Sequence, residues 1–363
     1  MKILHFISGV RGGGVEQVLI NYTHFLNMND NTDELIAYQH APIDVCAEKL
    51  KASGNSLVQI ADKRKHPIKN LADSYKLMRT FKPDIVHAHM SLLNFFPLFI
   101  ARLCGVKVRI SHAHISRNNV SPKLVPVFKR LNLLFANRLV ACGNDAGHYL
   151  YGSHPFWVMK NAIDLSNFSY SESRRKSFRN RLHITDNQIV LGHIGRFVVQ
   201  KNHKRLLEIF GALLQQRPDS IMVLAGDGEK MDEIKKQVKM MQIESNVRIL
   251  GSISNPAELY DAIDCFVLPS LYEGLPVVGI EAQAAGVPCL FSNTIDRDIR
   301  LLPTTKLIAL ENSNQEWVES ILELIHDGRV SSNTLAKILI SEGYKIELAA
   351  KQLDKYYQHV MEG

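Results

Sequence analysis

Short apolar runs alternate with amphipathic stretches along most of this chain of 363 residues. The runs are continuously hydrophobic, which is typical of strands buried on both faces of a parallel sheet. In the first half, we expect strands at residues 2–8, 35–38, 57–60, 84–88, 106–111, 139–141 and 156–159. Helical periodicity lies between them, at residues 15–26, 47–52, 68–80, 95–103, 123–136 and 144–150. This alternation predicts a doubly wound α/β domain.

The alternation restarts after a polar, basic interval at residues 164–187, and we expect the two domains to join near residues 160–188. In the second half, strands are expected at residues 189–194, 221–225, 247–250, 265–268 and 288–291. Helices are expected at residues 203–215, 230–241, 256–262 and 277–285, followed by further helices to the end. The chain is therefore predicted to form two Rossmann-like domains, with ligands beyond the carboxyl ends of the strands.

Composition and charge narrow the class of protein. A hydrophobic share of 46% with 22% charged residues excludes whole-chain disorder, collagen and coiled coil. Residues 1–164 carry 20 Lys and Arg against 11 Asp and Glu. This surplus suits nucleic acid, anionic lipid or phosphorylated ligands, or serves only solubility. The basic amphipathic stretch at 123–138 fits either a membrane surface or an ordinary domain helix.

Targeting signals and cysteine spacing indicate a cytoplasmic protein. Residues 3–7 are too short for a signal-peptide core, and the longest apolar run, 92–104, is too short for a membrane span. The five cysteines are scattered without paired spacing, as expected of reduced and mostly buried thiols.

A glycine-rich loop follows the first predicted strand, at residues 9–16, and opens a helix. Glycines allow close backbone approach, and a helix N-terminus offers N–H groups to a phosphate. The spacing is not G-x-G-x-x-G, so a nicotinamide dinucleotide site is poorly supported. A tight strand-to-helix turn without function is the alternative.

Three further features carry candidate chemistry. Arg196 and Lys201 lie on one strand-to-helix loop, where a guanidinium and an ammonium together suit a diphosphate. A solvated basic loop without function is the alternative. Glu273 and Glu281 lie eight residues apart around a predicted helix start at Pro276, so they can accept hydrogen bonds from different parts of one ligand. Glu281 is alternatively an exposed helix residue.

The third feature is a pair of His-x-His motifs at successive strand ends. His87 and His89 precede His112 and His114 by one strand, so parallel neighbours bring their imidazoles to one sheet edge. No acidic or cysteine partner has metal-ligand spacing, so we expect no metal. The Asp-x-Asp match at residues 296–298 is interpreted as surface.

The ordered set of these motifs resembles the retaining glycosyltransferases of family 4, over nearly the whole chain. The matching segments are Gly14-Val15-Glu16, Asn161-Ala162-Ile163-Asp164, Gly195-Arg196 with Lys201-Asn202, Gly226-Asp227-Gly228, and Glu273 to Glu281 with Gly286-Val287-Pro288 behind. The segment at residues 109–114 adds a likeness to exopolysaccharide and capsule enzymes. Two departures are Ala162 in place of glycine and a loop at 292–295 without paired glycines.

The resemblance implies the GT-B fold, two facing Rossmann-like doubly wound domains with an interdomain cleft. Residues 1–164 would bind the acceptor and residues 165–345 the nucleotide-sugar donor, while residues 346–363 would form a helix that crosses back to the first domain. The implied donor-binding residues are Gly13, Gly14, Gly195, Arg196, Lys201, Asn202, Gly226, Glu273, Gly274, Leu275 and Glu281. The implied acceptor-side residues are Gly12, Glu16 and His114, and the implied catalytic residues are His114, His112, Arg196, Lys201 and Glu273.

The implied reaction moves a hexosyl unit from a UDP-sugar to a lipid-linked or saccharide acceptor in surface polysaccharide biosynthesis. No cofactor or metal is expected, and neither is nucleic acid; the protein would be cytoplasmic, with peripheral contact to an anionic inner membrane face. A sugar-nucleotide epimerase or hydrolase of the same fold is the main alternative. A non-enzymatic polyanion or lipid-surface binder is another, although it leaves Glu273 and Glu281 beside Arg196 and Lys201 unexplained.

Overall fold

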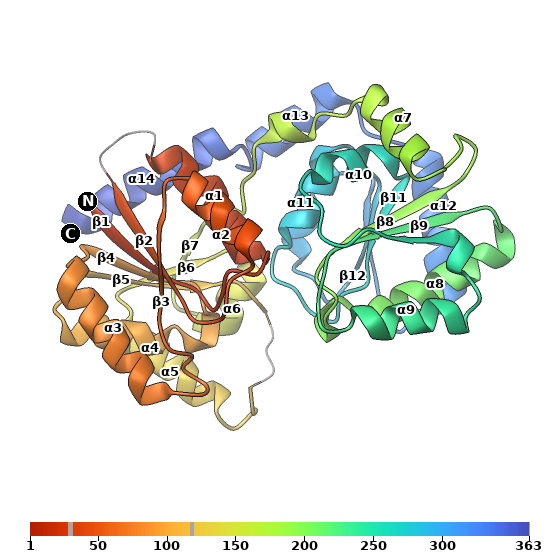
Figure 1. Cartoon of the computed structure of the whole chain (residues 1–363). Coiled ribbons are helices and arrows are strands. Elements are labelled where there is room, and N and C mark those ends of the chain that lie inside the picture. Colours follow the sequence, from red (N-terminus) through yellow and green to blue (C-terminus); the bar gives the residue numbers. More distant parts are fainter. Residues whose placement is uncertain (28–31, 117–119, 363) are drawn as a thin grey trace. The chain divides into compact units, whose positions relative to one another are not determined.

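The computed structural model describes residues 1–27, 32–116 and 120–362. The chain divides into two compact units, one formed by Met1–Ile163 with Gly343–Gly363 and the other by Asp164–Glu342. Both are built on a parallel sheet with helices on both faces (Figure 1).

The first unit contains a seven-stranded sheet in the order β3-β2-β1-β4-β5-β6-β7. Its strands are β1 (Lys2–Phe6), β2 (Asp33–Tyr38), β3 (Ser56–Gln59), β4 (Ile85–Ala88), β5 (Val108–Ala113), β6 (Arg138–Ala141) and β7 (Trp157–Val158). Its helices are α1 (Gly14–Asn27), α2 (Asp44–Ala52), α3 (Pro67–Phe81), α4 (Phe95–Leu103), α5 (Val125–Phe135), α6 (Asn144–Tyr151) and, from the end of the chain, α14 (Ile346–Glu362). The strand order reverses direction between β1 and β4, which makes that position the switch point of the sheet.

The second unit repeats this plan with six strands in the order β10-β9-β8-β11-β12-β13. Its strands are β8 (Val190–Ile194), β9 (Ile221–Ala225), β10 (Val247–Ile249), β11 (Cys265–Leu268), β12 (Cys289–Ser292) and β13 (Thr305–Ile308). Its helices are α7 (Glu172–Arg181), α8 (His203–Gln216), α9 (Met231–Met240), α10 (Pro256–Ala262), α11 (Val277–Ala284), α12 (Asn314–Asp327) and α13 (Ser332–Ser341). The switch point here lies between β8 and β11.

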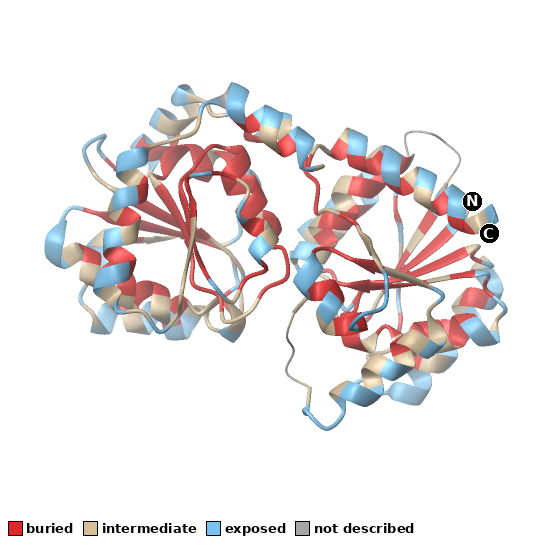
Figure 2. Cartoon of the chain, turned by 180° about the vertical axis from the view of Figure 1, so that it is seen from behind, coloured by how far each residue is buried: buried red, intermediate tan, exposed pale blue. Residues whose placement is uncertain are grey.

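The central strands of both sheets are buried, while the outer faces of the helices are exposed (Figure 2). All four residues of β4 and all four of β11 are buried. Strands covered on both faces need apolar side chains on both faces, which explains the continuous hydrophobic runs in the sequence.

The C-terminal helix α14 packs against α1 in the first unit. The return of the chain is fixed by main-chain pairing, because the Ile163 N–H donates to the Tyr344 carbonyl and Ile163 bridges to Lys345. The two termini consequently lie side by side (Figures 1 and 2).

The polar, basic interval at residues 164–187, in which no helix was expected, contains α7. This helix has little hydrophobic surface, and ion pairs attach it instead. Arg174 pairs with Asp261 at 2.5 Å, while Arg175 and Arg179 each pair with Asp264 at 2.8 Å. Ion pairs with Asp261 and Asp264 therefore hold this highly charged helix against the rest of the second unit.

Two smaller expectations also need correction. Strand β13 lies where only helices were expected. Its four residues include a lysine and are mostly half-buried, so they do not form a continuous apolar run. Asp296, interpreted as surface, is 1% exposed, and its carboxylate accepts from the Asp298 N–H. No described helix has both the length and the apolar composition needed to cross a bilayer.

Candidate functional site

The two loops that flank the switch point of the second sheet carry most of the predicted donor-binding residues. One loop follows β8 and reaches from Gly195 to Asn202, and the other follows β11 from Ser270 to Gly274. A main-chain bond from Leu271 N–H to the Gln200 carbonyl, at 2.8 Å, joins them. Parallel sheets bind ligands at this position.

Gly226 allows the backbone of a third loop, after β9, to touch the first. Its φ is +136°, and a Cβ at this position would lie 2.0 Å from the carbonyl oxygen of Gly195. Gly195 in turn leaves room for the side chain of Lys201, whose Cδ and Cε would lie 3.2 Å from a Cβ there. Gly226 is therefore required by the close approach of the two backbones, whereas a Cβ at position 195 would press against the side chain of Lys201.

Lys201 and Glu273 form an ion pair across the switch point. Lys201 Nζ lies 2.7 Å from Glu273 Oε1, with both side chains largely buried. Ser270 Oγ also donates to Oε1 at 3.1 Å, and Gln200 Nε2 donates to Oε2 at 3.1 Å. The carboxylate therefore holds the ammonium group of Lys201 in a fixed position, at the place where a phosphate would need a cation.

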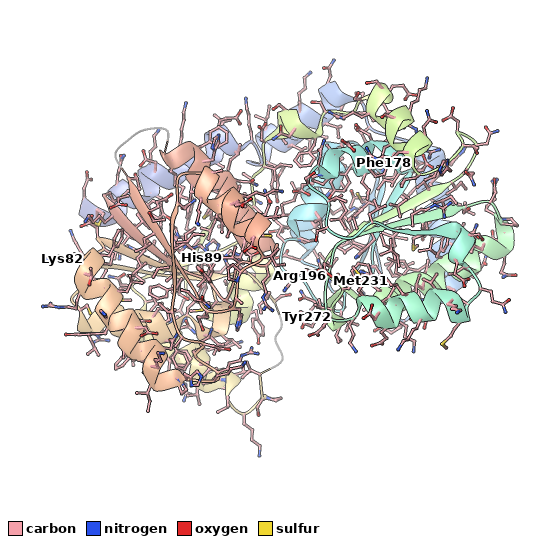
Figure 3. All side chains as sticks on the ribbon, viewed as in Figure 1. Lys82, His89, Phe178, Arg196, Met231 and Tyr272 are labelled. Atoms are coloured by element: carbon pink, nitrogen blue, oxygen red, sulfur yellow. The ribbon has the colours of Figure 1, made fainter. Side chains whose placement is uncertain are left out.

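Arg196 is exposed, and no hydrogen bond or ion pair to its guanidinium is found among the described residues. Arg196 and Tyr272 lie on the same side of the second unit, opposite Phe178 of α7 (Figure 3). Asn202 precedes α8 with φ of 54° and makes no side-chain cap. The first N–H groups of this 14-residue helix add a partial positive charge to the two cations, and this combination can bind an anion.

Glu281 lies inside α11 and is 6% exposed, so the alternative of an exposed helix residue is wrong. Its Oε2 accepts a 3.0 Å hydrogen bond from the Tyr260 hydroxyl. Burial, and then the charge of Glu281, raises the pKa of Tyr260 well above its ordinary value. Gly274 and Leu275 of the same segment are also buried. Thr294, in the loop without paired glycines, donates to the Ser270 carbonyl at 2.7 Å.

The glycine-rich loop of the first unit already binds a carboxylate of its own chain. Glu16, in the first turn of α1, accepts from the Arg11 N–H at 3.1 Å and from the Gly13 N–H. Gly12 has φ of +73°, which suits glycine. Glu16 therefore occupies two amides of the loop that precedes the helix.

The His-x-His motifs lie side by side at the carboxyl ends of the neighbouring strands β4 and β5. His87 Nε2 lies 3.1 Å from His112 Nδ1, and His89 Nδ1 lies 3.0 Å from His114 Nε2. Burial lowers the pKa of His87, His89 and His112 well below the ordinary value, and lowers that of His114 to about 3. The four rings are therefore neutral at physiological pH.

Three members of this cluster escaped the analysis of the sequence: His5, Glu34 and Tyr357. His5 of β1 pairs in register with His87, and its Nδ1 lies 3.1 Å from His89 Nε2. Its Nε2 lies 3.4 Å from Glu34 Oε1, and the Tyr357 hydroxyl lies 2.8 Å from His87 Nδ1. His5 and Glu34 are polar residues inside apolar runs, which was the available sign of a buried polar group. Tyr357 gave no such sign, because it comes from the far end of the chain.

Comparison with known proteins identifies the family of the chain. Residues 174–345 match the family described as glycosyl transferases group 1. Over 94% of its length the chain is 31% identical to EpsF of Bacillus subtilis, described by name as a glycosyltransferase, and covers 92% of that protein. It is 32% identical, over 62% of each chain, to the UDP-Gal:alpha-D-GlcNAc-diphosphoundecaprenol alpha-1,3-galactosyltransferase of Escherichia coli.

Among solved structures, Anabaena HepE in complex with UDP and glucose superposes with a TM-score of 0.83. The match covers 99% of each chain at 19% sequence identity. Two parallel doubly wound sheets, joined in this order, are the architecture of these enzymes. The chain has the GT-B fold and belongs to the group 1 glycosyltransferases.

Proposed function

We propose that this glycosyltransferase moves a hexosyl unit from a UDP-sugar to a lipid-linked or saccharide acceptor during assembly of a surface polysaccharide. The observation that carries the proposal is the ion pair between Lys201 and Glu273 at the switch point, beside Arg196 and the N-terminus of α8. The complex of HepE with UDP and the UDP-Gal donor named for the Escherichia coli relative support the choice of nucleotide. The diphosphoundecaprenol in that relative's name supports a lipid-linked acceptor.

In this proposal the second unit binds the donor. Arg196 and Lys201 bind the diphosphate and stabilise the negative charge that grows on it as the glycosidic bond breaks. Glu281 accepts hydrogen bonds from the ribose hydroxyls. Glu273, whose carboxylate also holds the ammonium group of Lys201, contacts a hydroxyl of the donor sugar.

The first unit would bind the acceptor. Gly12, Gly13 and Gly14 face the diphosphate and the acceptor, and Glu16 must release the Gly13 N–H before a ligand can use it. His114 lies at the reacting centre with His112 behind it. The configuration is retained, because the departing phosphate takes the acceptor proton on the face from which it leaves. Two cations and a helix end meet the phosphate charge, so no divalent metal is required.

The protein would act in the cytoplasm at the inner membrane face. The basic surplus of residues 1–164 and the helix α5, with Lys129 and Arg130, fit an anionic bilayer and a diphosphate-linked lipid. Neither a membrane nor a nucleic acid is needed for donor binding.

The proposal is tested by measuring UDP release from a panel of UDP-sugars, with and without an undecaprenyl-diphosphate-linked sugar. Each reaction is run with and without EDTA. We expect UDP release that depends on the acceptor, survives EDTA, and yields a product with the anomeric configuration of the donor by NMR. Release of UDP without acceptor would indicate a hydrolase, and interconversion of the UDP-sugar an epimerase. Loss of activity with EDTA would contradict metal independence.

A further inference from the structure

Five histidines from three neighbouring strands form one contiguous cluster in the first unit. They are His5 of β1, His87 and His89 at the end of β4, and His112 and His114 at the end of β5. The rings of His87 and His89 stack at 4.1 Å between centroids, and those of His112 and His114 stack at 3.9 Å. Four of the five are at most 4% exposed, and His89 lies among the strands of the sheet (Figure 3).

One row of hydrogen bonds runs through this cluster from a buried carboxylate to His114. Glu34 Oε1 lies 3.4 Å from His5 Nε2, His5 Nδ1 lies 3.1 Å from His89 Nε2, and His89 Nδ1 lies 3.0 Å from His114 Nε2. Glu34 is 2% exposed. Each ring in the row therefore uses Nε2 toward the carboxylate and Nδ1 away from it.

This repeated geometry determines the tautomers. A neutral imidazole has one donor and one acceptor nitrogen, whereas an ionised carboxylate only accepts. His5 must then donate through Nε2 and accept through Nδ1, and the same assignment passes to His89 and to His114. The row leaves His114 with its proton on Nε2 and a lone pair on Nδ1.

A second row has no such fixed end. The Tyr357 hydroxyl lies 2.8 Å from His87 Nδ1, and His87 Nε2 lies 3.1 Å from His112 Nδ1. Burial, followed by the charge of Glu34, raises the pKa of Tyr357 well above its ordinary value, so this group stays a hydroxyl. A hydroxyl both donates and accepts, so the second row runs in either direction. Among the described residues, its last atom, His112 Nε2, is buried with no hydrogen-bond partner.

We propose that Glu34 is a positioning residue for His114: acting through His5 and His89, it fixes the tautomer that presents Nδ1 of His114 as a hydrogen-bond acceptor for a sugar hydroxyl. The role of the hydroxyl rests on the proposed function; the control of the tautomer does not. The backbone supports the arrangement, because the His114 N–H donates to Ser91 Oγ at 3.0 Å and Asn94 Nδ2 donates to the His112 carbonyl at 3.0 Å.

The same nitrogens lie close enough together to raise the question of a metal ion. Two groups meet the distance requirement: His5 with His87 and His89, and His89 with His112 and His114. The separations of 3.0–3.1 Å between paired nitrogens are those of direct hydrogen bonds, and each pair needs no ion to be satisfied. The geometry therefore favours a proton-bearing row over a metal site.

The first test is the tautomer of His114 in the wild-type protein, measured from 15N shifts of labelled histidine in the presence and absence of EDTA. His114→Gln assigns the signal. We expect a single Nε2–H tautomer, unchanged by EDTA. An Nδ1–H tautomer, or signals that EDTA shifts, would overturn the proposal, and neither result depends on catalytic activity.

The second test is Glu34→Gln, which keeps the shape but presents an amide that donates as well as accepts. We expect mixed tautomers at His114 and a fall in kcat of about tenfold, with KM for the donor unchanged. Ser74→Ala is the matched control, a buried polar group of the same unit outside the rows, and should change neither property. An unaltered His114 tautomer in Glu34→Gln would overturn the proposal that Glu34 fixes this tautomer through His5 and His89. Altered tautomers with unaltered kcat would support this role of Glu34 and contradict the role of His114 in transfer.

Discussion

The two units use the same sheet plan but carry opposite kinds of chemistry at their switch points. In the second unit, a largely buried lysine–glutamate pair lies beside an exposed arginine. In the first unit, buried neutral histidines and a carboxylate replace cations, and Glu16 occupies the loop amides. The same sheet plan therefore presents charged side chains at one switch point and buried neutral side chains at the other, according to the residues at the strand ends.

The largest expected effect is a loss of stability confined to the second unit, which separates its packing from that of the first unit. Gly226→Ala places a Cβ 2.0 Å from the Gly195 carbonyl oxygen and should lower the free energy of unfolding by more than about 4 kcal/mol. Gly251→Ala is the control, since its φ is +70° but nothing lies within 4 Å of the added atom; we expect about 1–2 kcal/mol. Chemical denaturation measures both, and equal losses would contradict the packing argument.

Removal of the buried cation should separate donor chemistry from stability. Lys201→Ala is expected to lower kcat/KM about 10²–10³-fold, because the charge that develops on the diphosphate loses a preorganised partner. Lys204→Ala, three residues along on an exposed position, should retain wild-type kinetics. Steady-state kinetics with the preferred UDP-sugar measure kcat/KM for both variants. A similar loss of kcat/KM in both would indicate only a general effect of positive charge.

Acid should weaken the first unit more steeply than the second. Burial lowers the pKa of the four cluster histidines His87, His89, His112 and His114 and of the partly exposed His40 in the first unit, and of His193 and His203 in the second. Below pH 6.5 the unfolded chain binds protons that the folded units exclude, so stability present above that pH is lost as pH falls. Each such histidine costs about 1.4 kcal/mol per pH unit.

The four cluster histidines against His193 and His203 then give a difference between the units of about 2.7 kcal/mol per pH unit. Each unit contains one tryptophan, Trp157 or Trp317, so Trp157→Phe and Trp317→Phe provide separate fluorescence probes. Denaturant unfolding at pH 7, 6 and 5 should show the steeper loss for the first unit. Equal slopes would contradict the neutrality of its cluster.

The smallest effect concerns nucleotide recognition by Glu281. Glu281→Gln keeps the side-chain shape and a bond to Tyr260 but removes the charge that strengthens bonds to ribose hydroxyls, so UDP should bind about tenfold more weakly. Glu319→Gln on an exposed position of α12 is the control. Calorimetric titration with UDP measures the change, and an unaltered affinity would remove Glu281 from the nucleotide site.

The ordered motifs implied the GT-B fold through a family resemblance, while continuous apolar runs and helical periods predicted both sheets, because such patterns follow from burial on two faces. They also brought His87 beside His112, since parallel neighbours end at one edge. The roles assigned to Arg196, Lys201, Glu273 and Glu281 stay predictions until tested. Glu281 was correctly placed on a helix, but its burial was not predictable from an isolated carboxylate.

What the patterns missed depends on contacts between distant segments. His5 and Glu34 each interrupt an apolar run by one polar residue, and only the register of β1 with β4 shows that His5 meets His87. Tyr357 reaches the cluster because α14 returns to the first unit. Helix α7 was not predicted because its attachment is electrostatic rather than hydrophobic, and hydrophobic periodicity does not detect buried carboxylates such as Asp261.

The most direct test of the account is a calorimetric titration of the whole protein with UDP, compared with NAD, for the wild type, Lys201→Ala and His114→Ala. We predict that UDP binds the wild type and His114→Ala with similar affinity, that Lys201→Ala loses most of the binding, and that NAD gives no heat. Binding of NAD, or loss of UDP binding in His114→Ala while Lys201→Ala retains it, would contradict the assignment of the diphosphate to the second unit.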